Sequence, residues 1–272
     1  MPVRPVNGVR MHYERMPAVP PVRQPAPVVV FVHGLGTDSL ASFYLTLAAP
    51  VAAAGIDVIA YDLRAHGRSE APPTGYRMAD FVADLVGLLD ELGVTRPVHL
   101  VGNSFGGTIA FSVAAEFPER VASIVSIEAE PATGTWAAKM TETLDNTMKE
   151  FRKESFFVWL TETFGAHHTR LARAAAKRLL ATTMATDVPK GPLLDEAGLT
   201  RIQCPVLSIV GDAGFQKDDL TALEAALPHC TTEVMPGQDH SVLVNAHKAV
   251  RRLVLGWVGE HSTPGRVGVT TS

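Results

Sequence analysis

Val98-His-Leu-Val-Gly-Asn-Ser-Phe-Gly-Gly107 is the stretch of this sequence that decides the fold. It reads as a short apolar run, then a Gly-x-Ser-x-Gly turn centred on Ser104, then small residues in a helical pattern. A serine hydroxyl is an effective nucleophile only when it is exposed beside a base and near donors for an oxyanion. A tight strand-to-helix turn exposes it in this way, and the crowded backbone there requires small residues such as Gly102 and Gly106. An ordinary loop serine also fits the five-residue pattern, so the flanking strand and helix signals carry the prediction.

Length and composition limit the class of protein. The 272 residues suit one large α/β domain with an inserted subdomain, and the 46% hydrophobic and 19% charged content is ordinary for a globular enzyme. The net charge of −4, with no basic run, argues against a nucleic-acid partner. No apolar run reaches the length needed to span a membrane, so we expect no membrane partner.

Cysteine usage and the first residues bear on the cellular setting. Cys204 and Cys230 provide no framework for a secreted disulfide scaffold. The stretch from Met1 to Val6 lacks the apolar core of a signal peptide. These observations predict a cytoplasmic protein, and we expect it to be a monomer or a homodimer.

Apolar runs and helical patterns alternate along the chain. Asn7-Gly8 favours a hairpin turn, because both residues of a type I′ turn need a positive φ. Strands are predicted at Val28–His33, Asp57–Tyr61, Pro97–Gly102, Val121–Ile127, Pro205–Val210 and Thr231–Met235. Helices are predicted at Ser39–Gly55, Arg77–Leu92, Thr108–Phe117, Asp219–Leu227 and Ser241–Val258. Pro50 should break or kink the first of these helices. The alternation predicts an α/β fold with a mostly parallel sheet and helices on both faces.

One long segment departs from this rhythm. Residues 133–199 are helical in pattern, rich in charge and too long for a loop, which indicates a helical insertion. We therefore expect a core formed by residues 1–131 and 200–259, a helical cap at 132–199, and a disordered tail at 260–272. Four large apolar side chains of the insertion are candidates to bind an apolar substrate, although most such residues would form the insertion's own core: Trp136, Met140, Trp159 and Met184.

Several residues with chemical potential follow predicted strands. They are Gly34, Ser104, Glu128, Asp212 and His240. Because functional groups of such folds gather at the carboxyl ends of the strands, we expect these five residues to lie near one another.

Serine catalysis requires a base. Of ten histidines, His240 alone stands in a Gly-containing turn after the last strand, where neutral imidazole could take the proton from Ser104 and return it later. Backbone amides of Gly34-Leu35-Gly36 could donate to an oxyanion, although a simple turn explains these residues equally well. Asp62 to Ser69 reads as a turn held by local hydrogen bonds. No residue with ligand spacing accompanies His167-His168, so we expect no metal.

The order Ser104, acid, His240 resembles that of the α/β-hydrolase fold family, and the resemblance covers nearly the whole chain. It includes His33-Gly-Leu-Gly36, the segment from Asp62 to Ser69, the serine turn, the helical insertion and Gly237-Gln-Asp-His240. The resemblance implies an eight-stranded sheet, a cap inserted after the sixth strand, and no cofactor. It also implies an oxyanion hole formed by the amides of Leu35 and Phe105, with Gly34 as the alternative to Leu35.

The acid departs from the usual family pattern. Most members place an aspartate where this chain has Gly214, in a pattern resembling Gly-Asp-x-Asp. Asp212 lies two residues earlier, where the family uses it to support the turn. A minority of members place the acid directly after the preceding strand, as haloalkane dehalogenases with a glutamate there and the zearalenone lactonase do. Glu128 fits that position and is the expected acid, with Asp212 and Glu130 as alternatives.

The nucleophile narrows the chemistry. Haloalkane dehalogenases need an aspartate nucleophile, which Ser104 excludes, so acyl transfer to water through an acyl-serine remains. We therefore expect a serine hydrolase with a Ser-His-Glu triad that cleaves a small hydrophobic carboxylic ester or lactone. Thioester cleavage, carbon–carbon bond hydrolysis, a biosynthetic cyclase or acyltransferase, and a ligand receptor without turnover remain as alternatives.

Overall fold

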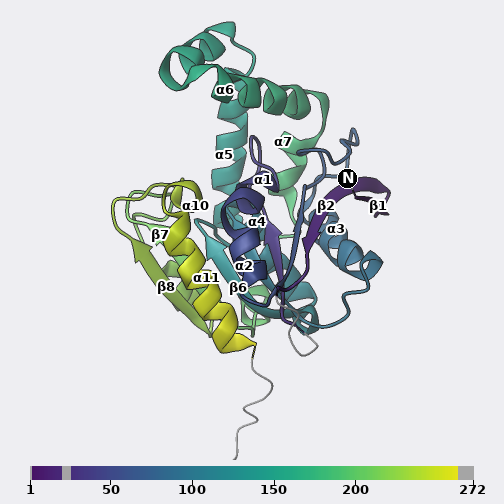
Figure 1. Ribbon diagram of the computed structural model, residues 1–272. Coiled ribbons are helices and arrows are strands. Elements are labelled where there is room, and N and C mark those ends of the chain that lie inside the picture. The colour runs from purple at the N-terminus through teal and green to yellow at the C-terminus, as the bar shows by residue number, and fades with distance from the viewer. Residues whose placement is uncertain (1, 20–25, 263–272) are drawn as a thin grey trace, which may run out of the picture.

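Eight strands form one sheet in the part of the chain that the computed structural model describes, residues 2–19 and 26–262 (Figure 1). The strands are β1 (Val3–Val6), β2 (Val9–Met16), β3 (Val28–Val32), β4 (Asp57–Tyr61), β5 (Val98–Asn103), β6 (Val121–Ile127), β7 (Val206–Gly211) and β8 (Cys230–Met235). Their order is β1-β2-β4-β3-β5-β6-β7-β8. Strands β3 to β8 are parallel, and β2 pairs antiparallel with β1 and β4. The predicted eight-stranded, mostly parallel sheet is confirmed.

The first two strands form the hairpin that the sequence predicts. Val6 pairs with Val9, and the two residues between them are Asn7 at φ 47° and Gly8 at φ 75°. Positive φ at both positions is the requirement of a type I′ turn.

Helices cover both faces of the sheet. They are α1 (Ala41–Phe43), a π-helix η1 (Tyr44–Ala48), α2 (Ala49–Ala53), α3 (Met78–Glu91), α4 (Phe105–Glu116), the 3-10 turn η2 (Pro118–Arg120), α9 (Ala222–Ala226), α10 (Val242–Asn245) and α11 (His247–His261). Alternate residues of β3 belong to different cores: Val30 packs in the core that contains α3 and α4, and Phe31 in the core that contains η1 and α11. Burial on both faces explains the continuous apolar run of this strand.

Two helix boundaries differ from the sequence predictions. The helix expected to break or kink at Pro50 does not break there: it changes to a π-helical turn at Tyr44–Ala48 and continues into α2, whose first turn contains the proline. Proline is tolerated there since it lacks only an N–H that the widened turn does not need. The tail was predicted from Glu260, but α11 runs to His261. The rest of the predicted tail, residues 263–272, lies outside the described residues.

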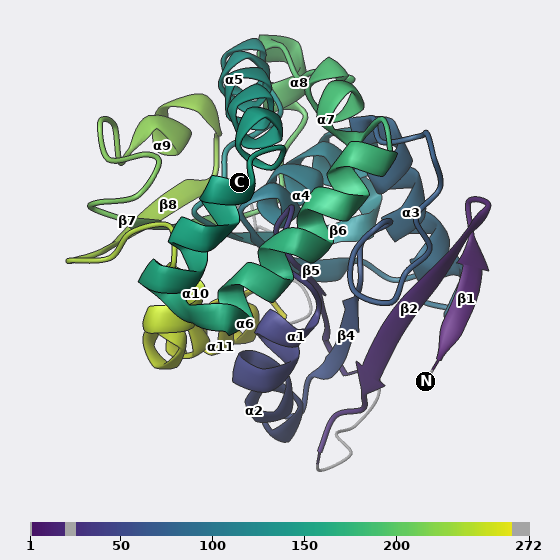
Figure 2. The same ribbon diagram turned by 90° about the horizontal axis from the view of Figure 1, so that it is seen from above.

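A group of helices lies between β6 and β7 in the sequence, and we call it the cap. It contains α5 (Gly134–Glu150), α6 (Glu154–Ala181), α7 (Met184–Asp187), the 3-10 turn η3 (Val188–Lys190) and α8 (Glu196–Thr200). Helix α6 bends at Gly165, whose φ of 85° is not helical. Figure 1 shows α5 to α7 at the top of the molecule, and Figure 2, seen from above, shows α6 crossing in front of the sheet. Among the described helices, none combines the length and apolar character that a membrane span requires.

Candidate active site

Ser104 occupies a strained turn between β5 and α4. Its φ of 51° and ψ of −123° are sparsely populated by residues other than glycine. The Ser104 amide donates to Ile127 O at 2.8 Å, which fastens the turn to β6. A Cβ atom at Gly102 would lie 2.4 Å from the carbonyl carbon of Gly106, and one at Gly106 would lie 2.0 Å from Val32 O. Both glycines are therefore required by close backbone approach, as the sequence predicts.

His240 comes from the turn after β8 and reaches Ser104. Its Nε2 lies 3.0 Å from Ser104 Oγ, and its Nδ1 lies 3.3 Å from Glu128 Oε2. The Phe215 ring stacks on the imidazole with the ring centroids 3.9 Å apart. With a proton on Nδ1, the imidazole can donate to Glu128 and accept the serine hydroxyl proton at Nε2.

Glu128 is buried directly after β6 and is held by backbone donors. Its Oε1 accepts from the Gly211 amide at 2.6 Å, and its Oε2 accepts from the Phe215 amide at 3.0 Å. These bonds fix the carboxylate from the neighbouring strand β7 and the loop that follows it. The two amides therefore stabilise the buried negative charge, and His240 is an additional partner of the same carboxylate.

The two alternative acids point elsewhere. Asp212 is exposed, and its Oδ1 accepts from the Gly237 amide at 2.8 Å, so it supports the turn that precedes His240. Glu130 pairs with Lys139 at 2.9 Å. The structure brings Glu128 to His240 and leaves Asp212 and Glu130 in other contacts.

The loop after β3 lies against the serine. A Cβ atom at Gly34 would be 3.4 Å from Ser104 Cβ. The Gly34 amide donates to Asp38 Oδ2 at 2.7 Å, and the Gly36 amide donates to His66 Nε2 at 2.9 Å. For the amides of Leu35 and Phe105, no acceptor exists within residues 2–19 and 26–262. These two N–H groups are thus available to a ligand, whereas that of Gly34 is engaged.

His66 remains neutral in this position. Burial, together with the nearby His33, lowers the pKa of His66 to about 3. Neutral imidazole with its proton on Nδ1 donates to Arg64 O at 2.9 Å and keeps Nε2 free to accept from Gly36. Neither His66 nor Asp38 was singled out from the sequence as part of a site. The proximity of His66 to Gly36 depends on a crossing between two loops, which no local pattern reveals.

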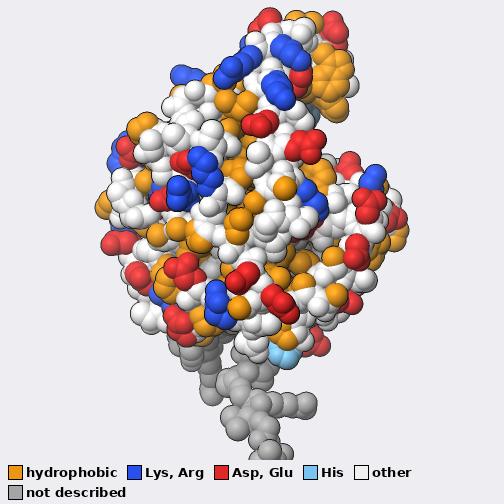
Figure 3. All heavy atoms as spheres, turned by 180° about the vertical axis from the view of Figure 1, so that it is seen from behind, with side chains coloured by type: hydrophobic (Ala, Val, Ile, Leu, Met, Phe, Trp, Pro, Cys, Tyr) orange, Lys and Arg blue, Asp and Glu red, His pale blue; other side chains and the backbone are white. Residues whose placement is uncertain are grey.

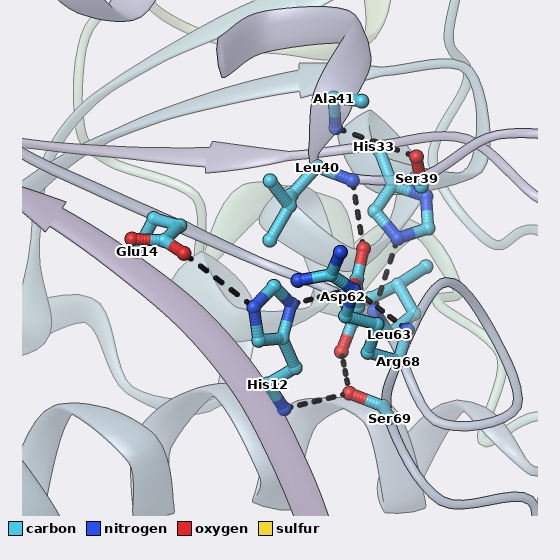
Figure 4. Close-up of polar contacts among 10 residues, drawn as sticks. All are labelled: His12, Glu14, His33, Ser39, Leu40, Ala41, Asp62, Leu63, Arg68 and Ser69. Atoms are coloured by element: carbon cyan, nitrogen blue, oxygen red, sulfur yellow. Dashed lines mark hydrogen bonds and ion pairs between the residues drawn. The ribbon is translucent and has the colours of Figure 1, made fainter. Parts of the chain in front are cut away.

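The segment from Asp62 to Ser69 supports the neighbouring loops (Figure 4). The Asp62 carboxylate accepts from the amides of Leu40 and Arg68, each at 2.9 Å, and contacts His12 Nδ1 at 2.7 Å. Ser69 Oγ donates to Asp62 O at 2.6 Å. These contacts match the predicted structural turn.

A cavity of about 310 Å³ opens at Ser104. One face of α5 lines it with Trp136, Lys139, Met140 and Thr143, whose spacing places them on the same side of the helix. Phe215 and Gln216 close another side. The cavity therefore joins the serine, the cap and the loop after β7.

Two of the four predicted substrate contacts lie away from this cavity. Trp159 is half-exposed on α6 and packs with Phe156 and Phe164. Figure 3 shows a group of hydrophobic side chains on the surface at the upper end of the molecule. Met184 is buried in the core that α3 and α4 share. Neither lines the cavity, because helix direction rather than residue type decides which cap side chains face the serine. Within the described part of the chain, no group of three or more His, Cys, Asp or Glu side chains is placed to hold a metal ion.

Comparison with known proteins identifies the family. The family described as the alpha/beta hydrolase fold matches residues 27–245. The chain belongs to the α/β-hydrolase family. Among curated relatives, a putative carbamate hydrolase of Variovorax paradoxus is 37% identical over 120 residues, which is 44% of this chain and 42% of that protein. The chain therefore aligns with less than half the length of that relative.

Other hydrolases match over more of their length. The 2-(acetamidomethylene)succinate hydrolase of Mesorhizobium japonicum is 26% identical over 79% of this chain and 82% of its own. A carboxylesterase structure from Nitrososphaera gargenis has a TM-score of 0.74 and 22% identity, covering 96% of this chain and 99% of that one. The enol-lactonase of Burkholderia xenovorans has a TM-score of 0.73 and 21% identity, with 95% and 100% covered. At these identities the structural likeness shows the fold.

Proposed function

We propose that this protein is a serine hydrolase that cleaves a carboxylic ester or lactone of a hydrophobic substrate through an acyl-serine intermediate. The observation that carries the proposal is the chain of contacts from Ser104 Oγ to His240 Nε2 and from His240 Nδ1 to Glu128. A serine, a histidine that can take its proton, and a carboxylate that orients the histidine are the parts that acyl transfer needs. The cavity at Ser104 supplies space for a small substrate.

The proposed reaction begins with proton transfer. His240 Nε2 takes the Ser104 proton as Oγ attacks the substrate carbonyl carbon, and the carbonyl oxygen becomes an oxyanion. The amides of Leu35 and Phe105 are the proposed donors to that oxygen, since neither has an acceptor among the described residues. Leu35 is favoured over Gly34 because Asp38 already occupies the Gly34 amide.

The second half of the reaction reverses these roles. His240 returns its proton to the leaving alkoxide, which leaves the acyl group on Ser104. Water then gives a proton to His240 and attacks the acyl carbon, and the carboxylic acid leaves as Ser104 regains its proton. Glu128 holds the Nδ1–H tautomer and stabilises the imidazolium that forms in both halves. These steps need no cofactor.

The lining of the cavity favours an apolar group next to the scissile bond. Trp136, Met140 and Phe215 present aromatic and thioether surface to the space beside Ser104. Such surface gains free energy when it is removed from water against an apolar ligand. The two cap residues retained as proposed substrate contacts are therefore Trp136 and Met140.

We also propose a cytoplasmic setting and a monomeric or homodimeric state. Cys204 and Cys230 are both free, and burial raises the pKa of each thiol to about 12. Thiols held protonated in this way react slowly with oxidants and disulfides. Light scattering of the purified chain would measure the oligomeric state.

Progress curves with p-nitrophenyl esters and a panel of lactones test the function. We expect many turnovers per protein molecule, and we expect Ser104→Ala to remain folded by circular dichroism and lose turnover. Ser155→Ala, an exposed serine of the cap, is the matched control and should keep full activity. Binding of ligand without repeated turnover would contradict the proposal and indicate a receptor. Mass spectrometry of the products separates hydrolysis from acyl transfer to another hydroxyl.

A further inference from the structure

The peptide group that carries the Leu35 N–H is oriented by a histidine. His33 Nδ1 lies 2.7 Å from Gly34 O, and His33 Nε2 accepts from the Leu63 amide at 3.0 Å. Because Nε2 accepts, the proton is on Nδ1 and is donated to Gly34 O. Carbonyl and N–H of a trans peptide point in opposite directions, so this bond turns the Leu35 N–H away from His33.

The next peptide groups along the loop are held from two different parts of the protein. The Gly36 amide is bound by His66, which belongs to the core. The Gly36 carbonyl accepts from Arg178 Nη2 at 2.9 Å, and Arg178 belongs to α6 of the cap, 142 residues further along the chain. Gly36 thus joins the proposed oxyanion loop to the cap.

Arg178 has an unusual environment for a surface arginine. Its side chain is partly buried, and burial lowers the pKa of Arg178. Among the described residues no carboxylate lies within 4 Å of its guanidinium nitrogens, and Gly36 O is the acceptor of its side-chain hydrogen bond. The Asp62 carboxylate acts on the guanidinium only from beyond ion-pair distance and raises the pKa of Arg178 less than burial lowers it. The Gly36 carbonyl is therefore the acceptor that Arg178 contacts directly.

Gly36 has no side chain that would restrain the backbone of the loop. Its φ of 86° lies in the region that glycine enters freely, and a Cβ atom there would meet nothing within 4 Å. Gly36 also stands between Leu35 and Asp38, whose carboxylate binds the Gly34 amide. A rotation at Gly36 would therefore disturb both sides of the Leu35 N–H.

We propose that Arg178 is a positioning residue that fixes the oxyanion loop from the cap through the Gly36 carbonyl. The inference rests on the proposed function, because it gives Arg178 a role in stabilising the oxyanion of that reaction. The oxyanion hole is then complete only while α6 is seated on the loop. Arg178 does not itself touch the substrate, since it does not line the cavity at Ser104.

The test compares Arg178→Ala and Arg178→Lys with Lys177→Ala, which removes an exposed positive charge from the adjacent position of α6. Initial rates on a p-nitrophenyl ester give kcat and KM separately. For Arg178→Ala we expect kcat to fall about 10-fold, less than the loss of a whole oxyanion donor, with KM changed less than about 3-fold. Arg178→Lys should recover part of kcat, because lysine can donate one hydrogen bond but lacks the planar fork.

The affinities of two ketone inhibitors measure the strength of the oxyanion hole. A trifluoromethyl ketone adds to Ser104: the Oγ–carbon bond forms, the ketone oxygen becomes an oxyanion, and the serine proton passes to His240. The methyl ketone of the same chain length binds without this addition. Arg178→Ala should lower the affinity for the trifluoromethyl ketone about 10-fold, as it lowers kcat, and should leave the affinity for the methyl ketone unchanged.

The outcomes separate the two proposals. Equal loss of affinity for both ketones, or wild-type kcat in Arg178→Ala, would overturn the positioning role while the hydrolase proposal stands. Failure of the wild-type protein to hydrolyse esters and to bind the trifluoromethyl ketone would overturn both. If Arg178→Ala does not fold, Arg178→Lys decides, because it must show the same selective loss to a smaller degree.

Discussion

The carboxylate of Glu128 occupies the space that a side chain at Gly214 would need. A Cβ atom at Gly214 would lie 2.3 Å from both oxygens of Glu128. Gly214 is the position at which most α/β-hydrolases of this pattern are expected to carry an aspartate. The chain therefore brings a carboxylate to the same point near His240 from β6 rather than from the loop after β7. The Glu128 carboxylate can lie at this point only because residue 214 has no side chain.

Glu128→Gln should lower kcat by about 1,000-fold or more, the size of effect seen when the orienting acid of a triad becomes an amide. The amide keeps the shape of the carboxylate but can no longer fix the Nδ1–H tautomer or stabilise the imidazolium. Asp212→Asn is the control, because Asp212 holds the Gly237 turn and not His240. We expect it to reduce kcat less than about 10-fold on the same ester. A larger loss in Asp212→Asn than in Glu128→Gln would move the acid to Asp212.

Moving the acid tests the shared space. Gly214→Asp alone should destabilise the protein, because its Cβ would overlap the Glu128 carboxylate and two like charges would be buried together. Glu128→Gly removes that overlap and suits the φ of 50° at this position. The double variant Glu128→Gly/Gly214→Asp should therefore be more stable than Gly214→Asp in urea unfolding and more active than Glu128→Gly. An inactive double variant that folds well would show that the two positions are not interchangeable.

Much of this site follows from local sequence signals. The turn around Ser104 needs glycines at fixed offsets, and His240 follows the last strand, so pattern alone could predict that these two side chains meet. Glu128 could be predicted as the acid because Gly214 carries no carboxylate and another strand end must then supply one. In contrast, the contact between Arg178 and Gly36 O joins residues 142 positions apart. Such contacts depend on how the cap sits on the core, as does the placement of Trp159 outside the cavity.

Because His66 is buried in its neutral form, the free energy of unfolding should fall as the pH is lowered. Burial lowers the pKa of His66 from the ordinary histidine value of 6.5 to about 3, so an unfolded chain binds a proton that the folded chain excludes. The neutral His66 contributes on the order of 5 kcal/mol to the free energy of unfolding. This contribution is complete above pH 6.5 and is lost progressively as the pH falls toward 3. His66→Gln keeps an acceptor for the Gly36 amide and does not titrate. Its free energy of unfolding should fall less steeply between pH 6.5 and 4.

Urea unfolding at several pH values measures that slope. His229→Gln replaces an exposed histidine and should leave the slope of the wild-type protein unchanged. Buried His99, whose pKa burial lowers to about 4, remains in both variants and contributes equally to each. Parallel acid profiles for His66→Gln and the wild type would contradict a neutral, buried His66.

The close approach at the serine turn predicts a large cost for one methyl group. Gly106→Ala would place a Cβ atom 2.0 Å from Val32 O, which is backbone of a central strand and cannot move aside. We expect a loss of about 3 kcal/mol or more in the free energy of unfolding. Gly134→Ala, at the first turn of α5, meets nothing within 4 Å and should be neutral or slightly stabilising. Similar free energies of unfolding for the two variants would mean that the turn can move to accommodate a methyl group at position 106.

The charges at the cavity predict discrimination against anionic substrates. Besides the buried Glu128, three charged residues line it: Glu130, Lys139 and Glu142. Lys139 is paired with Glu130 at 2.9 Å, whereas Glu142 has no cation within 4 Å in the described chain. The excess charge beyond the ion pair is negative and lies near the mouth, because Glu142 is exposed. A carboxylate on the substrate would be repelled there by about 1 kcal/mol in high dielectric.

A neutral ester should therefore have a kcat/KM about 5-fold above that of an equally long ester with a terminal carboxylate, since 1.4 kcal/mol is a factor of ten. Glu142→Gln should bring the kcat/KM values of the neutral and anionic esters closer together. Added salt should do the same in the wild-type protein, because Glu142 is exposed to solvent. Glu162→Gln removes a charge from the exposed part of α6, outside the cavity lining, and should leave the ratio unchanged. Equal ratios in Glu142→Gln and the wild type would assign the discrimination, if any, to shape rather than charge.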